Sequence, residues 1–106
     1  MSDRTSVRDL NDTFRRAGRG GRLMLTRGIA GRPDKQEILA RIARFEEFTQ
    51  DNDPYGEHDF GSIRHKGETI FWKIDYYDLT MQSGSSDPAN PMITTRVLTV
   101  MLADEY

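Results

Sequence analysis

The densest group of chemically capable side chains is Glu57-His58-Asp59, which places two carboxylates and an imidazole in three consecutive residues. A metal ion needs about three such ligands that converge on one point. Consecutive residues of a strand point to opposite faces of a sheet, so these three converge only in a loop. Asp75 or Asp78 would complete the ligand set. A metal site at Glu57, His58 and Asp59 is therefore an alternative, and the main expectation is a protein without a metal or other cofactor.

His58 could also act as a general acid or base, because its intrinsic pKa lies near neutral pH. Asp59 or Asp75 would then orient the imidazole, which makes a small hydrolase the second hypothesis for this motif. No strand–turn–helix elbow surrounds the candidate nucleophiles, which are Ser62, Thr94 and Thr95. The catalytic set His58, Asp59 and Asp75 is therefore an alternative to a protein without enzymatic activity.

The elements that must position this motif begin with two amphipathic helices and a short strand. Val7, Leu10, Phe14 and Ala17 recur at helical spacing and predict a helix over 6–17. A short apolar-centred run predicts a strand over 22–27, which could lie at either edge of a sheet. Pro33 suits the first turn of a helix, and an apolar stripe continues that helix over 33–49.

From residue 57 onward the apolar pattern changes to strand spacing. Lys66-Gly67 is typical of a hairpin turn between strands over 57–65 and 69–77. In the second of these strands, Ile70, Trp72, Ile74 and Tyr76 share the predicted core face. Residues 79–92 form a loop, and 94–102 form the last strand. We predict an α+β two-layer sandwich with a mostly antiparallel four-stranded sheet and two helices on one face.

The composition limits the class of protein. A chain of 106 residues forms one domain, here 1–106, and it has no cysteine for a disulfide or a thiolate metal site. It has no apolar run of about 18 residues that could span a membrane and no apolar signal segment, so we expect a cytoplasmic protein without membrane contact. The net charge of −2 conceals a division. Residues 1–48 carry eleven basic and seven acidic side chains, so this half is basic. Residues 49–106 carry four basic and ten acidic side chains, so this half is acidic.

The basic half suggests a third hypothesis, which is nucleic-acid binding. Arginines cluster in the first third of the chain at positions 15, 16, 19, 22, 27 and 32, and arginine-rich segments grip phosphates. The acidic chain as a whole and the lack of a nucleic-acid-binding motif argue against this ligand.

The acidic half suggests a different partner from nucleic acid, namely a protein that the chain binds through acidic and aromatic side chains. If the helices cover only one sheet face, Phe71 and Tyr77 lie on the other face and mark a surface for a partner or for a homodimer. The predicted binding residues are Asp51, Asp53, Tyr55, Glu57, Asp59, Phe71, Asp75, Tyr77 and Asp78.

Several runs of sequence carry a resemblance that spans nearly the whole chain. The main ones are LNDTFR from Leu10, LTRGI from Leu25, NDPYGEHDFG from Asn52, FWKIDYYD from Phe71, and RVLTVMLADEY from Arg96. With them, the chain resembles a family of small proteobacterial proteins of unknown function that are typical of plasmids, prophages and other mobile elements. The resemblance implies no activity, cofactor or catalytic residue. It implies a context in which small acidic proteins often antagonise host defence, such as CRISPR or restriction systems. The leading hypothesis is therefore a non-enzymatic binding module that engages a host protein or protein complex.

Overall fold

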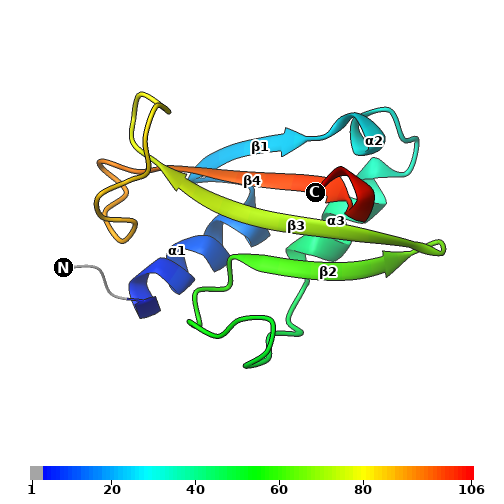
Figure 1. Cartoon of the computed structure of the whole chain (residues 1–106), viewed down its shortest axis with the longest axis horizontal. Helices are drawn as coiled ribbons and strands as arrows, with labels where there is room; N and C mark the ends of the chain where they lie inside the picture. Colours follow the sequence, from blue (N-terminus) through cyan, green and yellow to red (C-terminus); the bar gives the residue numbers. More distant parts are fainter. Residues whose placement is uncertain (1–3) are drawn as a thin grey trace.

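The computed structural model describes residues 4–106, which form an α+β fold with the helices on one face of a four-stranded sheet (Figure 1). The chain order is α1 (Arg4–Ala17), β1 (Gly21–Leu25), α2 (Arg27–Ala30), α3 (Lys35–Ala43), β2 (Phe60–His65), β3 (Glu68–Tyr77), β4 (Thr95–Leu102) and the 3-10 turn η1 (Ala103–Glu105). The predicted fold class is confirmed. None of the helices within residues 4–106 is long and apolar enough to cross a membrane.

The sheet is mixed, with the strand order β1-β4-β3-β2. β2, β3 and β4 pair antiparallel, whereas β1 runs parallel to β4 and lies at the edge of the sheet. The β2–β3 hairpin turns at Lys66 and Gly67, as predicted. Both residues have positive φ, at 52° and 82°, which matches the right-handed twist of the flanking strands.

The core lies between the sheet and the three helices. Ile70, Trp72 and Ile74 of β3 are buried on the predicted face, and Tyr76 packs partly buried beside them. Leu98 and Val100 of β4 point to the same side. The helices contribute Phe14, Ile29, Ile38 and Ile42 to this core. On the other sheet face no α-helix of residues 4–106 covers β4, and Val97, Thr99 and Met101 line a hollow there (Figure 1).

The predicted strand over 22–27 is wrong at its end, because β1 stops at Leu25 and Arg27–Ala30 form the short helix α2. Thr26 donates the last backbone hydrogen bond of β1 to the Val100 oxygen, and its own oxygen then accepts from the amides of Ile29 and Ala30. This turn buries Ile29 completely. Burial of one isoleucine contributes about 2 kcal/mol, which outweighs extending an edge strand by two residues.

The predicted helix over 33–49 is also too long, because α3 ends at Ala43. The guanidinium of Arg15 from α1 lies at that end, where its Nη1 donates to the backbone oxygens of Ile42, Ala43 and Phe45. A positive charge at a helix C-terminus compensates the unpaired carbonyl groups of the last turn. The chain then leaves the helical path and places Phe45 and Phe48 against Trp72.

Candidate binding surface

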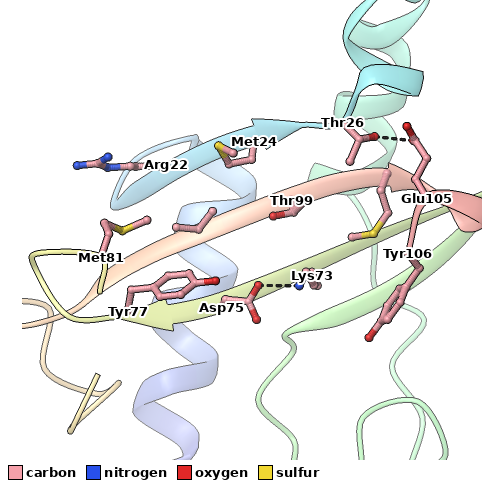
Figure 2. Close-up of a pocket in the computed structure, with 12 residues that line it drawn as sticks. Arg22, Met24, Thr26, Lys73, Asp75, Tyr77, Met81, Thr99, Glu105 and Tyr106 are labelled. Atoms are coloured by element: carbon pink, nitrogen blue, oxygen red, sulfur yellow. Dashed lines mark hydrogen bonds and ion pairs between the residues drawn. The ribbon is translucent and has the colours of Figure 1, made fainter. Parts of the chain in front are cut away.

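The open face of the sheet carries a hollow of about 510 Å³ across β1, β4 and β3 (Figure 2). Its floor is formed by β4, and its sides are formed by Met24 of β1 and Tyr77 of β3. The two ends are formed by Met81 and by Tyr106. Methionine, tyrosine and valine side chains dominate the lining, so the surface of the hollow is mainly apolar.

The charged groups of this hollow are unevenly paired. Lys73 and Asp75, which are neighbours on the open face of β3, form an ion pair of 3.1 Å between Nζ and Oδ2. The hydrogen bond that Lys73 donates to Asp75 raises the pKa of Lys73, although partial burial opposes this rise. Arg22 on β1 has no ion-pair partner within residues 4–106. The hollow therefore presents one unneutralised cation on the β1 side.

The C-terminal residues close one end of the hollow through Glu105. Its Oε1 accepts from the Thr26 hydroxyl at 2.6 Å (Figure 2). The same oxygen accepts from the Leu102 amide at 2.9 Å, and Oε2 accepts from the Gly28 amide at 2.8 Å. These hydrogen bonds lower the pKa of Glu105, that from Thr26 most. Glu105 thus joins the end of the chain to the β1–α2 connection, which is 77 to 79 residues away.

Tyr106 lies next to two other aromatic rings on the open face. Its ring centroid is 5.8 Å from that of Phe71 and 6.4 Å from that of Phe60, and Phe60 and Phe71 are 5.4 Å apart. Such distances are typical of favourable edge-to-face aromatic pairs. Tyr106 remains 75% exposed, so this aromatic group extends the apolar surface of the hollow toward β2.

The predicted motif around His58 lies on the helix side of the sheet, away from this hollow. The Nδ1 atom of His58 is 3.0 Å from Oδ1 of Asp12 on α1, and its Nε2 atom is 3.6 Å from Oδ2 of Asp53. The imidazole also stacks on Phe48. Both ring nitrogens therefore face carboxylates of the protein itself, and neither is directed at an open site.

The contacts of His58 with Asp12 and Asp53 form one part of a polar region on the helix side of the sheet. Glu57 and Tyr76 form a second part of this region. The Tyr76 hydroxyl donates to Glu57 Oε1 at 3.0 Å and accepts from the Asn11 amide at 2.8 Å. Burial raises the pKa of Tyr76 far above its usual value, and the carboxylates of Asp59 and Glu57 add to the rise. Asn11 in turn accepts from Arg96 Nε at 2.9 Å. This network joins α1, β3, β4 and the loop before β2.

The structure directs the side chains of the Glu57-His58 part of the motif to different partners. Glu57 turns to Tyr76, whereas His58 turns to Asp12 and Asp53. Within residues 4–106, no three histidine or carboxylate side chains are grouped to hold a metal ion. These contacts hold the loop over 46–59 against α1, through His58 and Asp12, and against β3, through Glu57 and Tyr76.

Comparison with known proteins gives a family for the chain. A family profile described as a protein of unknown function, DUF3768, matches residues 25–105. The chain belongs to DUF3768. No curated protein and no solved structure shows a significant match. The matched range runs from the end of β1 to η1, so both the hollow and the His58 region lie largely within the DUF3768 sequence.

The predicted binding residues are divided between these two regions. Phe71, Asp75 and Tyr77 lie on the open face, as predicted. Asp53, Glu57 and Asp59 lie with His58, and burial raises the pKa of Asp59, as do the charges of Glu57, Asp53 and Asp75. The remaining predicted residues are Asp51 and Tyr55, which are exposed in the loop before β2, and Asp78, whose Oδ1 accepts from Thr80 and Gln82.

Sequence reasoning missed the part of the hollow that β1 and the C-terminus contribute. Arg22 and Met24 alternate with Leu23 and Leu25, and this spacing of two is the signal that could have placed Arg22 and Met24 on the open face. No local signal joins Glu105 to Thr26. The arginines of the first third are also separated: Arg15 is buried under α3, and Arg32 is bound to Asp34 and Glu68.

Proposed function

We propose that the protein is a non-enzymatic binding module whose partner is another protein, and that the open sheet face is its binding surface. The observation that carries this proposal is the hollow of about 510 Å³ on the sheet face that the helices leave uncovered. Its side chains include those that interface cores favour, namely methionine, tyrosine and arginine, and the two charged groups nearest its floor, Lys73 and Asp75, are paired with each other.

The position of His58 supports a role without catalysis. A general base needs a free ring nitrogen within about 3 Å of the proton that it removes. In this chain one nitrogen lies 3.0 Å from Asp12 and the other 3.6 Å from Asp53, while the ring face is covered by Phe48. These contacts are those of a histidine that holds a loop in place.

A narrower form of the proposal concerns the partner. The resemblance to small proteins of mobile elements supports a partner in a host defence system, such as a CRISPR or restriction component, which the chain would inhibit inside the cytoplasm. On the open face, the aromatic side chains Tyr77 and Phe71 supply surface for such a partner, whereas the charge of Asp75 is paired with Lys73.

The general proposal is tested by filling the hollow. Thr99 lies on its floor at the centre of β4, so Thr99→Arg places a long side chain where the partner would dock. Gln50→Arg is the matched control, because Gln50 is exposed in the loop between α3 and β2 and does not line the hollow. Tagged wild type and both variants are used to capture proteins from a host lysate, with quantitative mass spectrometry and a check of thermal unfolding.

We expect one or more proteins to be recovered by wild type and Gln50→Arg and to be lost with Thr99→Arg, and the purified partner to bind the three chains in the same order of affinity. Equal recovery by all three folded chains contradicts the proposal. The narrower form is tested by phage plating on hosts with an active CRISPR or restriction system. Wild type is expected to restore plaques and Thr99→Arg is not, whereas unchanged plating with wild type rejects inhibition of that system.

A further inference from the structure

The two edges of the sheet differ in how their backbone groups are protected. At the β2 edge, Arg41 of α3 reaches over and its Nη1 donates to the Arg64 backbone oxygen at 2.6 Å. At the β1 edge, no side chain of residues 4–106 bonds to the backbone of Gly21–Leu25. This strand also has no proline or bulge, which are common means of preventing further strand pairing, and its one charged side chain is Arg22. β1 is therefore the edge that can accept another strand.

The direction of the backbone groups on β1 follows from its pairing with β4. The Thr26 amide donates to the Val100 oxygen, so the amides of alternate residues, Met24 and Arg22, also face β4. The N–H and C=O groups of Leu23 and Leu25 consequently face outward. Figure 1 shows β1 along the upper rim of the sheet, with its outer side away from β4.

Hollows lie on both faces of this edge. On the helix side, a hollow of about 380 Å³ lies between β1, α1 and α3, with Leu23, Phe14 and Leu39 in its lining. On the open side, the hollow already described begins at Arg22 and Met24. Leu23 is 48% exposed and Met24 is 56% exposed. Because side chains of a strand alternate between faces, a strand added beside β1 directs successive side chains over the two hollows in turn.

The charge around this edge selects the chemistry of the added strand. The exposed arginines near it are Arg16, Arg19, Arg22 and Arg27. Among the described residues, Arg19, Arg22 and Arg27 have no acidic partner, and Arg16 has only a 3.9 Å contact with Glu46. Pairing of β1 with a second copy of the chain would bring these cations together, and like charges across an interface are unfavourable. An acidic strand neutralises them.

We propose that β1 accepts an extended acidic segment of a partner protein as a fifth strand of the sheet, with apolar side chains of that segment over the two hollows. Main-chain hydrogen bonds to Leu23 and Leu25 would supply affinity, and the arginines would supply selectivity for Asp and Glu. The inference rests on the proposed function only in taking a protein as the partner, and it specifies the form of the segment that is bound.

The test uses the whole chain and a displayed library of random 12-residue peptides. We expect the enriched peptides to alternate apolar residues with Asp or Glu, and their binding to weaken at least tenfold between low and high salt. In hydrogen exchange by NMR, such a peptide should protect the amides of Leu23 and Leu25 in the wild-type chain. Enrichment of neutral or basic peptides, or of none, overturns the inference, as does protection elsewhere.

Leu23→Pro removes an outward N–H without removing a bond to β4, which an edge strand tolerates. Arg22→Glu reverses one charge, and Arg64→Glu makes the same change on the opposite edge strand as the matched control. We expect Leu23→Pro and Arg22→Glu each to weaken peptide binding at least tenfold and Arg64→Glu to leave it within twofold. Equal binding by all three overturns the inference.

A second copy of the chain is the competing occupant of the edge. Light scattering should give the mass of one chain, 12.2 kDa. A doubled mass that Leu23→Pro abolishes overturns the acidic-segment inference, because the edge then binds its own copy. None of these outcomes depends on Thr99. Loss of partner with Thr99→Arg but not with Leu23→Pro therefore rejects the edge and keeps the open-face proposal.

Discussion

The imidazole of His58 lies flat on the ring of Phe48, with the centroids 3.7 Å apart and the ring planes only 2° apart. His58 also has a left-handed backbone, with φ at 56°. The left-handed conformation is energetically unfavourable for any residue other than glycine. Contacts with Phe48 and Asp12 must therefore hold His58 in this conformation. The loop before β2 is thus fixed by one residue whose backbone is strained and whose ring is well bound.

This combination predicts an unusual order of stability for two substitutions at position 58. His58→Ala should lower the free energy of unfolding by about 2 kcal/mol, because the ring stack and the contact with Asp12 are lost. His58→Gly loses the same contacts but removes left-handed strain of about 1 kcal/mol. We expect His58→Gly to be the more stable variant in urea unfolding. The reverse order would show that the left-handed backbone is not strained.

A second prediction concerns the end of α3. Arg15→Met removes the donor to three backbone oxygens and leaves Asp12 without its 3.0 Å ion pair, so the free energy of unfolding should fall by about 3 kcal/mol. Arg16→Met is the matched control. Its exposed ion pair with Glu46 is 3.9 Å long, and loss of such a pair costs about 0.5 kcal/mol. Equal losses in guanidinium unfolding would show that Arg15 does not act as a helix cap.

A third prediction separates two glycines by the space around them. A Cβ at Gly61 would overlap the Trp72 indole and lie 2.9 Å from the Phe45 ring, so Gly61→Ala should cost about 3 kcal/mol. A Cβ at Gly31 meets nothing within 4 Å, and φ there is −87°. Gly31→Ala should therefore leave stability unchanged or raise it by about 0.5 kcal/mol. Thermal unfolding of both variants checks the difference, and a stable Gly61→Ala protein would show that β2 and Trp72 can separate without cost.

A fourth prediction uses the pH dependence of Asp59. Burial raises the pKa of Asp59, so the folded chain holds this proton more tightly than the unfolded chain. Stability therefore falls as pH rises from the unfolded pKa, about 4, through the folded pKa. Asp59→Asn removes this loss, and its melting temperature should exceed that of wild type at pH 7 but not at pH 3.5. The control, Asp51→Asn, alters an exposed side chain of the same loop and should follow wild type at both pH values. A constant difference between Asp59→Asn and wild type would exclude this origin of the pH dependence.

The parts of the fold that follow short-range rules were predictable from the sequence. The alternation from Ile70 to Tyr76 placed the core face of β3, and Lys66-Gly67 placed the hairpin, because strand spacing and left-handed turns depend on adjacent residues. The same alternation put Phe71 and Tyr77 on the open face, where both line or border the hollow. In that sense part of the candidate surface could be found from a single strand.

The partners of His58 and the end of α3 could not be found in this way. Asp12 is 46 residues from His58, and Arg15 is 27 to 30 residues from the carbonyl groups that it binds. Helical spacing predicted that the apolar stripe of α3 reaches Phe48, because Phe45 and Phe48 stand at positions that a longer helix would bury. In the structure the same two side chains pack against Trp72 without a helix. Only the position of α1 distinguishes the two arrangements.

The sequence by itself determined the α+β fold class, the faces of β3, the hairpin and the separation of charge between the two halves of the chain. Tertiary structure alone decided that β1 lies parallel to β4 at an open edge, that Glu105 closes the hollow against Thr26, and that the Glu57-His58-Asp59 motif divides between two sets of partners. The physical reason is that helical and strand periods, like turn propensities, are set by neighbouring residues. Edge position, buried hydrogen bonds and hollows depend on groups that folding brings together from distant parts of the chain.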